Sequence, residues 1–190
     1  SISSLITKCV ITSLILLCFA TIGLATNNYF YGIDYTQAKL FASTDKPKQI
    51  KISLIRINEL LISEKENYDI SKFVKTTIDG VNIEGVTLRN SEINEEAILT
   101  QSNEDIFVSE DLTKQIVKSL VISEKEGTGY LFIAKLLNNK KKLGQYDIVA
   151  FDIATRDIIY IKPAKGKAKG FGIRNFWAGS IRKMISKKLK

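Results

Sequence analysis

Three strand-like patterns follow one another near the carboxyl end of the chain, and they constrain the fold more than any other feature. Residues 129–137 (GYLFIAKLL) are almost continuously apolar, which is typical of a central strand buried on both faces. Residues 143–153 (LGQYDIVAFDI) alternate between two faces, and residues 158–163 (IIYIKP) form a third apolar run. Because a Lys-rich tip and a tight ATRD turn join these runs, they predict a meander of three strands.

An amphipathic helix is expected to close the chain from about Ile173. Its apolar positions recur every three or four residues, which places them on one stripe of a helix: Ile173, Phe176, Trp177, Ile181, Met184, Ile185 and Leu189. The basic residues between them fall outside that stripe. We therefore expect the helix to cover the sheet, with Phe176 and Trp177 as its largest anchors and its charges in water.

The preceding residues contain weaker patterns. Residues 29–43 are aromatic and apolar and predict a first strand or strand pair. Helical spacing of apolar residues predicts a helix after Pro47 and another after Ser109, whereas residues 76–106 are interpreted as irregular strands. The sequence thus predicts an α/β (α+β) fold. Its sheet would be mixed or antiparallel, of about four to six strands, with three main helices packed on it.

The amino-terminal segment has the pattern of a secretory signal peptide. Lys8 precedes 17 uncharged residues, Cys9 to Ala25, and small residues (Gly23 and Ala25) stand before a cleavage point at Thr26. A retained membrane anchor is the alternative, because a run of this length just suffices to cross a bilayer. We expect residues 1–25 to be signal or anchor and residues 26–190 to form one exported domain, periplasmic or secreted.

Positive charge is concentrated at the carboxyl end. The chain has a net charge of +8, and residues 162–190 contain eight Lys, two Arg and no acidic residue. The glycines and cations that lead into the closing helix are the candidate binding or loop-anchoring residues: Lys165, Gly166, Lys167, Lys169, Gly170, Gly172, Arg174 and Asn175. They suit a phosphate or carboxylate at a helix start, or an anionic lipid surface with Phe176 and Trp177 inserted. An ordinary closing helix with a solvated basic face also explains them, and nucleic acid is not expected as a partner.

The composition argues against most catalytic chemistry. The chain has no histidine, which excludes Ser-His-Asp and Cys-His catalysis and every His-containing metal site. Both cysteines, Cys9 and Cys18, lie in the amino-terminal apolar run. Asp147 and Asp152 are five residues apart on one predicted strand and so face opposite ways. We therefore expect no enzyme activity, no catalytic or metal-binding residues and no cofactor.

The carboxyl-terminal motifs resemble a known family. Phe151–Ala154 (FDIA), Gly166–Gly172 (GKAKGFG) and Arg174–Ala178 (RNFWA) are similar to the ending of a family of uncharacterised exported proteins from Gram-negative bacteria. Lys169 stands where that pattern has glycine. At the level of fold, the order of elements also resembles the amino-terminal domain of TolB and related envelope proteins. This likeness implies a domain used in protein–protein contacts.

Three functional hypotheses follow, in order of preference. The first is a non-catalytic exported protein with a binding or envelope-assembly role, whose partner is another envelope protein. The second is a peripheral module that binds anionic lipid or a small anion through the basic carboxyl-terminal segment. The third is a hydrolase.

Overall fold

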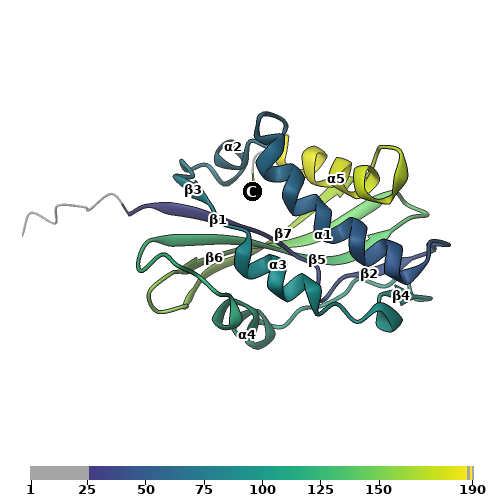
Figure 1. Cartoon of the computed structure of the whole chain (residues 1–190), viewed down its shortest axis with the longest axis horizontal. Helices are drawn as coiled ribbons and strands as arrows, with labels where there is room; N and C mark the ends of the chain where they lie inside the picture. The colour runs from purple at the N-terminus through teal and green to yellow at the C-terminus, as the bar shows by residue number, and fades with distance from the viewer. Residues whose placement is uncertain (1–25, 188, 190) are drawn as a thin grey trace, which may run out of the picture.

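The computed structural model describes residues 26–187 and 189, so the predicted signal or anchor segment lies outside the described residues. In chain order, strands and helices form the arrangement drawn in Figure 1. Two short 3-10 helices, Lys65–Asn67 and Glu95–Ala97, complete it. The main elements are β1 (Asn28–Asp34), β2 (Lys39–Phe41), α1 (Pro47–Ser63), α2 (Ile70–Val74), β3 (Gly80–Val81), α3 (Glu84–Ser91), β4 (Leu99–Thr100), α4 (Glu110–Ser119), β5 (Thr128–Asn138), β6 (Leu143–Asp152), β7 (Ile158–Lys167) and α5 (Gly172–Ile185).

The long strand β5 organises the sheet. Along one edge it pairs first with β1 and then with β2, so these two strands act as successive parts of one neighbour. The short strands β3 and β4 extend the sheet beyond β1 and β2. Along its other edge β5 pairs with β6, which in turn pairs with β7.

The expected sheet class was wrong. Within the described residues the sheet has seven strands rather than four to six. Its pairings are mainly parallel: β1 with β3 and β5, and β2 with β4 and β5. The β5–β6–β7 meander is antiparallel, as its short connections require. Five α-helices in the part of the chain that the structure describes flank the sheet, in a curled, Rossmann-like α/β arrangement.

The error has a physical source in residues 76–106, which were interpreted as irregular strands. This segment contains a full helix, α3, whose buried residues include only one large apolar side chain, Val86. Its glycine and asparagine lower the helical signal of the sequence further. Because the sequence analysis did not identify α3, it contained no signal that β1 and β2 run parallel to β5.

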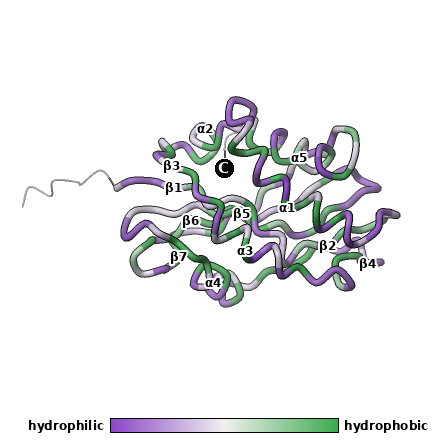
Figure 2. The backbone as a smooth tube through the Cα atoms, in the orientation of Figure 1, coloured by the Kyte–Doolittle hydropathy of each residue, from purple (hydrophilic) through white to green (hydrophobic). Residues whose placement is uncertain are grey.

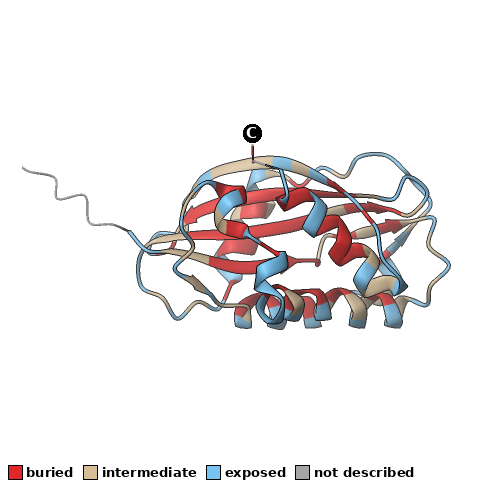
Figure 3. Cartoon of the chain, turned by 90° about the horizontal axis from the view of Figure 1, so that it is seen from above, coloured by how far each residue is buried: buried red, intermediate tan, exposed pale blue. Residues whose placement is uncertain are grey.

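Helices cover both faces of the sheet, as Figure 1 shows, with α1, α2 and α5 on one side and α3 and α4 on the other. Alternate residues of β5 therefore enter different cores: Phe132 packs on the α1/α5 side and Leu131 on the α4 side. Strands β1, β5 and β6 are consequently mostly buried, whereas most residues of the outer strand β7 are half-buried or exposed (Figure 3). Hydrophilic residues concentrate in the outer loops (Figure 2). None of the described helices is long and apolar enough to span a membrane.

The closing helix is confirmed. α5 begins at Gly172, one residue before the expected start, and Trp177 is 1% exposed. Phe176 is half-buried and packs at the edge of the same core. In α4, Ser109 caps the helix as the sequence pattern predicts, by accepting a hydrogen bond from the Leu112 amide. The apolar spacing after Ser109 also predicts an inward-facing Val121, but this residue follows α4 and is exposed.

Glycines at two positions, one in β7 and one in α5, allow the helix to lie very close to the sheet. A Cβ added at Gly166 of β7 would overlap the Ser180 carbonyl oxygen, and one added at Gly179 of α5 would overlap the Lys169 carbonyl oxygen. Between them, the hydroxyls of Tyr146 and Ser180 hydrogen-bond inside the interface. The backbone contact therefore fixes both the depth and the register of α5 on β6 and β7.

Two buried asparagines stabilise the end of β1, where β3 no longer pairs with it. Asn58 of α1 accepts a hydrogen bond from the Ile33 amide (2.7 Å) and donates one to the Ile33 carbonyl (2.9 Å). Asn90 of α3 donates to the same carbonyl and accepts from the Tyr35 amide. The two side chains make the hydrogen bonds that a neighbouring strand would otherwise make. The buried backbone groups of Ile33 and the Tyr35 amide are therefore all paired.

Gly166→Ala should destabilise the protein by about 3 kcal/mol, because the new methyl group must displace α5 from the sheet. Urea unfolding followed by circular dichroism measures this change. Lys165→Ala, at an exposed neighbouring position of β7, should change the free energy of unfolding by less than about 0.5 kcal/mol. Equal stability of the two variants would contradict the proposed backbone contact.

Asn58→Ala should lower the free energy of unfolding by about 2 kcal/mol, since it leaves the buried Ile33 amide without an acceptor. Amide hydrogen exchange should accelerate most at Ile33. Asn67→Ala, an exposed position in the 3-10 helix after α1, is the matched control and should be nearly neutral. Unchanged protection at Ile33 would disprove the role assigned to Asn58.

Candidate functional site

Lysines from two distant parts of the sequence meet beside α5. The tip of the β5–β6 hairpin contacts the end of β7, where the Ala168 amide donates a hydrogen bond to the Lys142 carbonyl (2.8 Å). The ammonium of Lys167 donates to the Lys141 carbonyl (3.3 Å). The register of β6 on β7 therefore brings the Lys-rich hairpin tip to the segment that precedes α5.

These lysines and α5 enclose a groove of about 550 Å³, which we call the basic groove. Its charged lining consists of five cations and no carboxylate, and none of the five is in an ion pair among the described residues. Like charges that are held together by the backbone raise the local positive potential and attract anions. The lining residues are Lys142, Lys167, Ala168, Lys169, Gly179, Arg182, Lys183 and Ser186.

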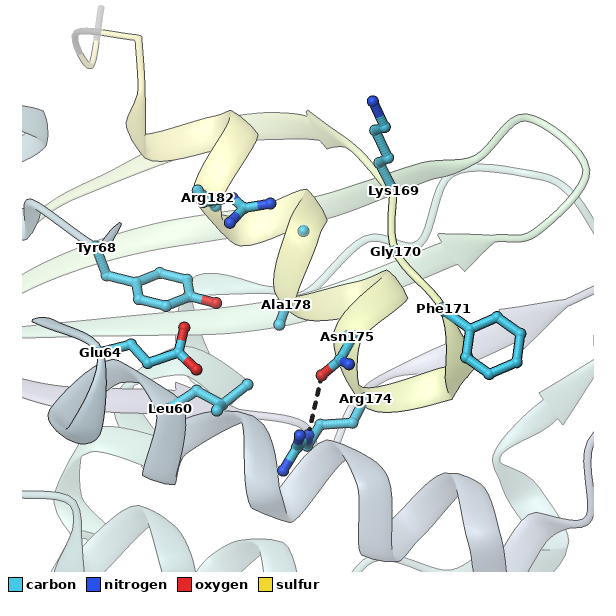
Figure 4. A pocket seen from close by; sticks show the side chains of 11 residues that line it. Leu60, Glu64, Tyr68, Lys169, Gly170, Phe171, Arg174, Asn175, Ala178 and Arg182 are labelled. Atoms are coloured by element: carbon cyan, nitrogen blue, oxygen red, sulfur yellow. Dashed lines mark hydrogen bonds between the residues drawn. The ribbon is translucent and has the colours of Figure 1, made fainter. Parts of the chain in front are cut away.

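A second hollow, the α1–α5 cavity, lies on the other side of the contact between Lys169 and Gly179. It has a volume of about 320 Å³ and is bounded by the end of α1, by Tyr68, by the segment before α5 and by α5 itself. Arg174 and Arg182 line it from α5, and Glu64 and Tyr68 face them across the cavity (Figure 4). Its lining is thus mixed in charge, unlike that of the basic groove.

Tyr68 is the buried polar group of the α1–α5 cavity. Its side chain is 6% exposed, and its hydroxyl points into the cavity. Burial raises the pKa of this phenol, and the nearby Glu64 carboxylate raises it further, whereas Arg182 and Arg174 oppose the shift. Tyr68 is therefore neutral near pH 7 and available as a hydrogen-bond donor.

The structure separates the candidate residues that the sequence analysis grouped together. Lys169, Gly170, Arg174 and Asn175 line the α1–α5 cavity, and the Arg174 guanidinium donates to the Asn175 side chain (3.1 Å). Lys167 lines the basic groove together with Lys169.

The other three candidates have different environments. Lys165 lies apart from both hollows, 3.8 Å from the Asp105 carboxylate. Gly166 belongs to β7 rather than to a loop and serves the packing of α5. Gly172 begins α5 with a positive φ of 76°, a conformation that suits glycine.

Sequence reasoning missed the residues that come from elsewhere in the chain. Leu60, Glu64 and Tyr68 reach the α1–α5 cavity from α1 and the turn after it, and no motif connects them with the carboxyl-terminal segment. From the sequence, Lys142 could be recognised only as part of a Lys-rich hairpin tip. The antiparallel register of β6 and β7, which places Leu143 opposite Lys167, is the signal that could have linked it to the site.

The two aspartates that were considered as a catalytic pair, Asp147 and Asp152, both make structural contacts. Asp147 is buried and pairs with Lys135 at 2.8 Å. Asp152 accepts a hydrogen bond from the Thr155 amide in the turn before β7. Within residues 26–187 and at 189, no group of three or more Cys, Asp or Glu side chains is placed to hold a metal ion.

Comparison of the chain with protein-family models, with curated proteins and with solved structures found no match. The similarity to an exported family and to the TolB amino-terminal domain therefore stays a prediction from the motifs.

Proposed function

We propose that this chain is a non-catalytic binding protein that recognises a partner protein through acidic side chains, with the basic groove as its contact surface. The observation that carries this proposal is the convergence of Lys142, Lys167, Lys169, Arg182 and Lys183 around one groove without a carboxylate. Placing like charges together is unfavourable for the isolated protein, and an acidic partner relieves this repulsion.

A binding role fits the chemistry of the chain better than a catalytic one. The sequence supplies no histidine for acid–base work near neutral pH. The buried carboxylates Asp34 and Asp147 are each held by a cation, Arg89 and Lys135, so both are committed to the structure.

The proposed setting is outside the cytoplasm, with another envelope protein as partner. The support is the uncharged run Cys9 to Ala25 with small residues at its end, which follows the pattern of an export signal. We propose a periplasmic or secreted protein, with a retained anchor over residues 9–25 as the alternative.

One observation favours a second candidate, an anionic lipid surface. Phe171 is 95% exposed at the edge of the α1–α5 cavity, in the segment that also carries Lys169 (Figure 4). An exposed aromatic side chain beside cations is a combination found in peripheral membrane proteins. In this lipid-binding hypothesis the inserting side chain is Phe171 rather than Trp177, because Trp177 is buried and cannot insert into a bilayer.

Charge reversal tests the proposed surface. The triple variant Lys142→Glu, Lys167→Glu and Lys183→Glu should reduce crosslinked complexes in envelope fractions at least tenfold, because it replaces attraction by repulsion. Intact mass of the captured species, compared between wild type and variant, identifies partners that depend on the groove. Raising the salt concentration should weaken the wild-type complexes, since the contact is exposed.

The matched control reverses three exposed lysines far from the groove in the sequence: Lys72, Lys118 and Lys125. It should capture the same complexes as the wild type. Equal capture by both triple variants would reject the basic groove as the contact. Salt-sensitive flotation with phosphatidylglycerol vesicles that is lost on Phe171→Ser would instead support the lipid surface.

A further inference from the structure

The α1–α5 cavity holds a polar group that the protein itself leaves without a partner. None of the described residues hydrogen-bonds the Tyr68 hydroxyl. The residue as a whole is 94% buried, but its hydroxyl is open to the cavity, into which it points (Figure 4). A hydroxyl in such a position needs water or a ligand as its partner. The cavity volume of about 320 Å³ is at the small end of the range for small-molecule sites.

Two guanidinium groups border the same space. Arg174 and Arg182 stand two turns apart on α5, roughly 12 Å along the helix axis. Ala178 and Gly179, which have no long side chain, lie between them and line the cavity. Arg182 is in no ion pair among the described residues, so its fork of N–H donors is free for an oxyanion.

Glu64 gives the cavity a second, opposite preference. Its carboxylate lies beside the Tyr68 hydroxyl on the wall that faces α5, as Figure 4 shows. A carboxylate accepts hydrogen bonds from ammonium or hydroxyl groups and repels a bare anion. A ligand that suits the whole cavity therefore carries an anionic group and a donor close together.

We propose that the α1–α5 cavity binds a small molecule with a carboxylate and an adjacent ammonium or hydroxyl group, that is, an amino acid or a hydroxy acid. The carboxylate accepts from Arg182 and from the Tyr68 hydroxyl, and the neighbouring donor contacts Glu64. Arg174 lies at the other end of the cavity, where it adds positive potential. This function is separate from recognition of a partner at the basic groove, because it needs Tyr68 and Glu64 rather than the surface lysines.

Nuclear magnetic resonance of the ¹⁵N-labelled protein tests this with four small probes: glycine, glycolate, acetate and methylammonium. Glycine and glycolate should shift the Nε–H signals of Arg174 and Arg182 in a saturable manner, with dissociation constants in the millimolar range expected for such small ligands. Acetate, which lacks the donor, should bind at least threefold more weakly. Methylammonium, which lacks the anion, should leave these signals unchanged.

Two variants assign the contacts. Tyr68→Phe removes only the hydroxyl and should weaken glycine binding about fivefold, in line with one lost hydrogen bond. Glu64→Gln should abolish the preference for glycine over acetate. Glu66→Gln, at an exposed position two residues away, is the control and should preserve that preference.

The outcomes decide the proposal. It is overturned if glycine and glycolate cause no saturable shift, or if acetate binds as well as glycine irrespective of Glu64. Loss of glycine binding in Tyr68→Phe with an unchanged unfolding temperature supports it, since a folding defect is then excluded. The charge-reversal variant of the basic groove should still bind glycine, so failure at one site does not count against the other.

Discussion

The close contact between α5 and the sheet is the constraint on which both candidate binding regions depend. Gly166 and Gly179 let the backbones approach to a distance that any side chain at these positions would prevent. The Tyr146–Ser180 hydrogen bond then fixes the helix along its axis. Because the Lys169 carbonyl rests on Gly179, this contact also divides the surface into the basic groove on one side and the α1–α5 cavity on the other.

The same geometry explains how one short segment contributes to two different surfaces. Lys169 and Arg182 line both hollows, but their neighbours differ. Toward the hairpin tip the neighbours are lysines, which raise the local positive potential. Toward α1 they are Glu64 and Tyr68, which enclose a smaller and more selective space. Glu64 and Tyr68 thus add a hydrogen-bond acceptor and a hydroxyl to a surface that is otherwise lined by cations.

Local patterns predicted the elements well where the apolar period was strong. The stripe of α1 (Ile50, Leu54, Ile57 and Leu61) is buried, and the β5–β6–β7 meander and the burial of Trp177 follow the sequence analysis. The sheet class was predicted wrongly, because pairing between β1 and β5 joins residues about a hundred positions apart and leaves no local signal. Of the cavity residues, Arg174 and Asn175 could be proposed from the motif, whereas Tyr68 reaches the site only through tertiary packing.

The position of β5 also sets the order in which the molecule can assemble. Both β1 and β2 have β5 as their neighbour on the central side of the sheet, so these strands lack a complete central partner until residue 138 has been synthesised. Residues 128–185, in contrast, form β5, β6, β7 and α5 through neighbouring connections alone. Contacts between neighbours in the sequence close at low entropic cost. We therefore expect residues 128–185 to fold first, and β1 and β2 to pair with β5 afterwards.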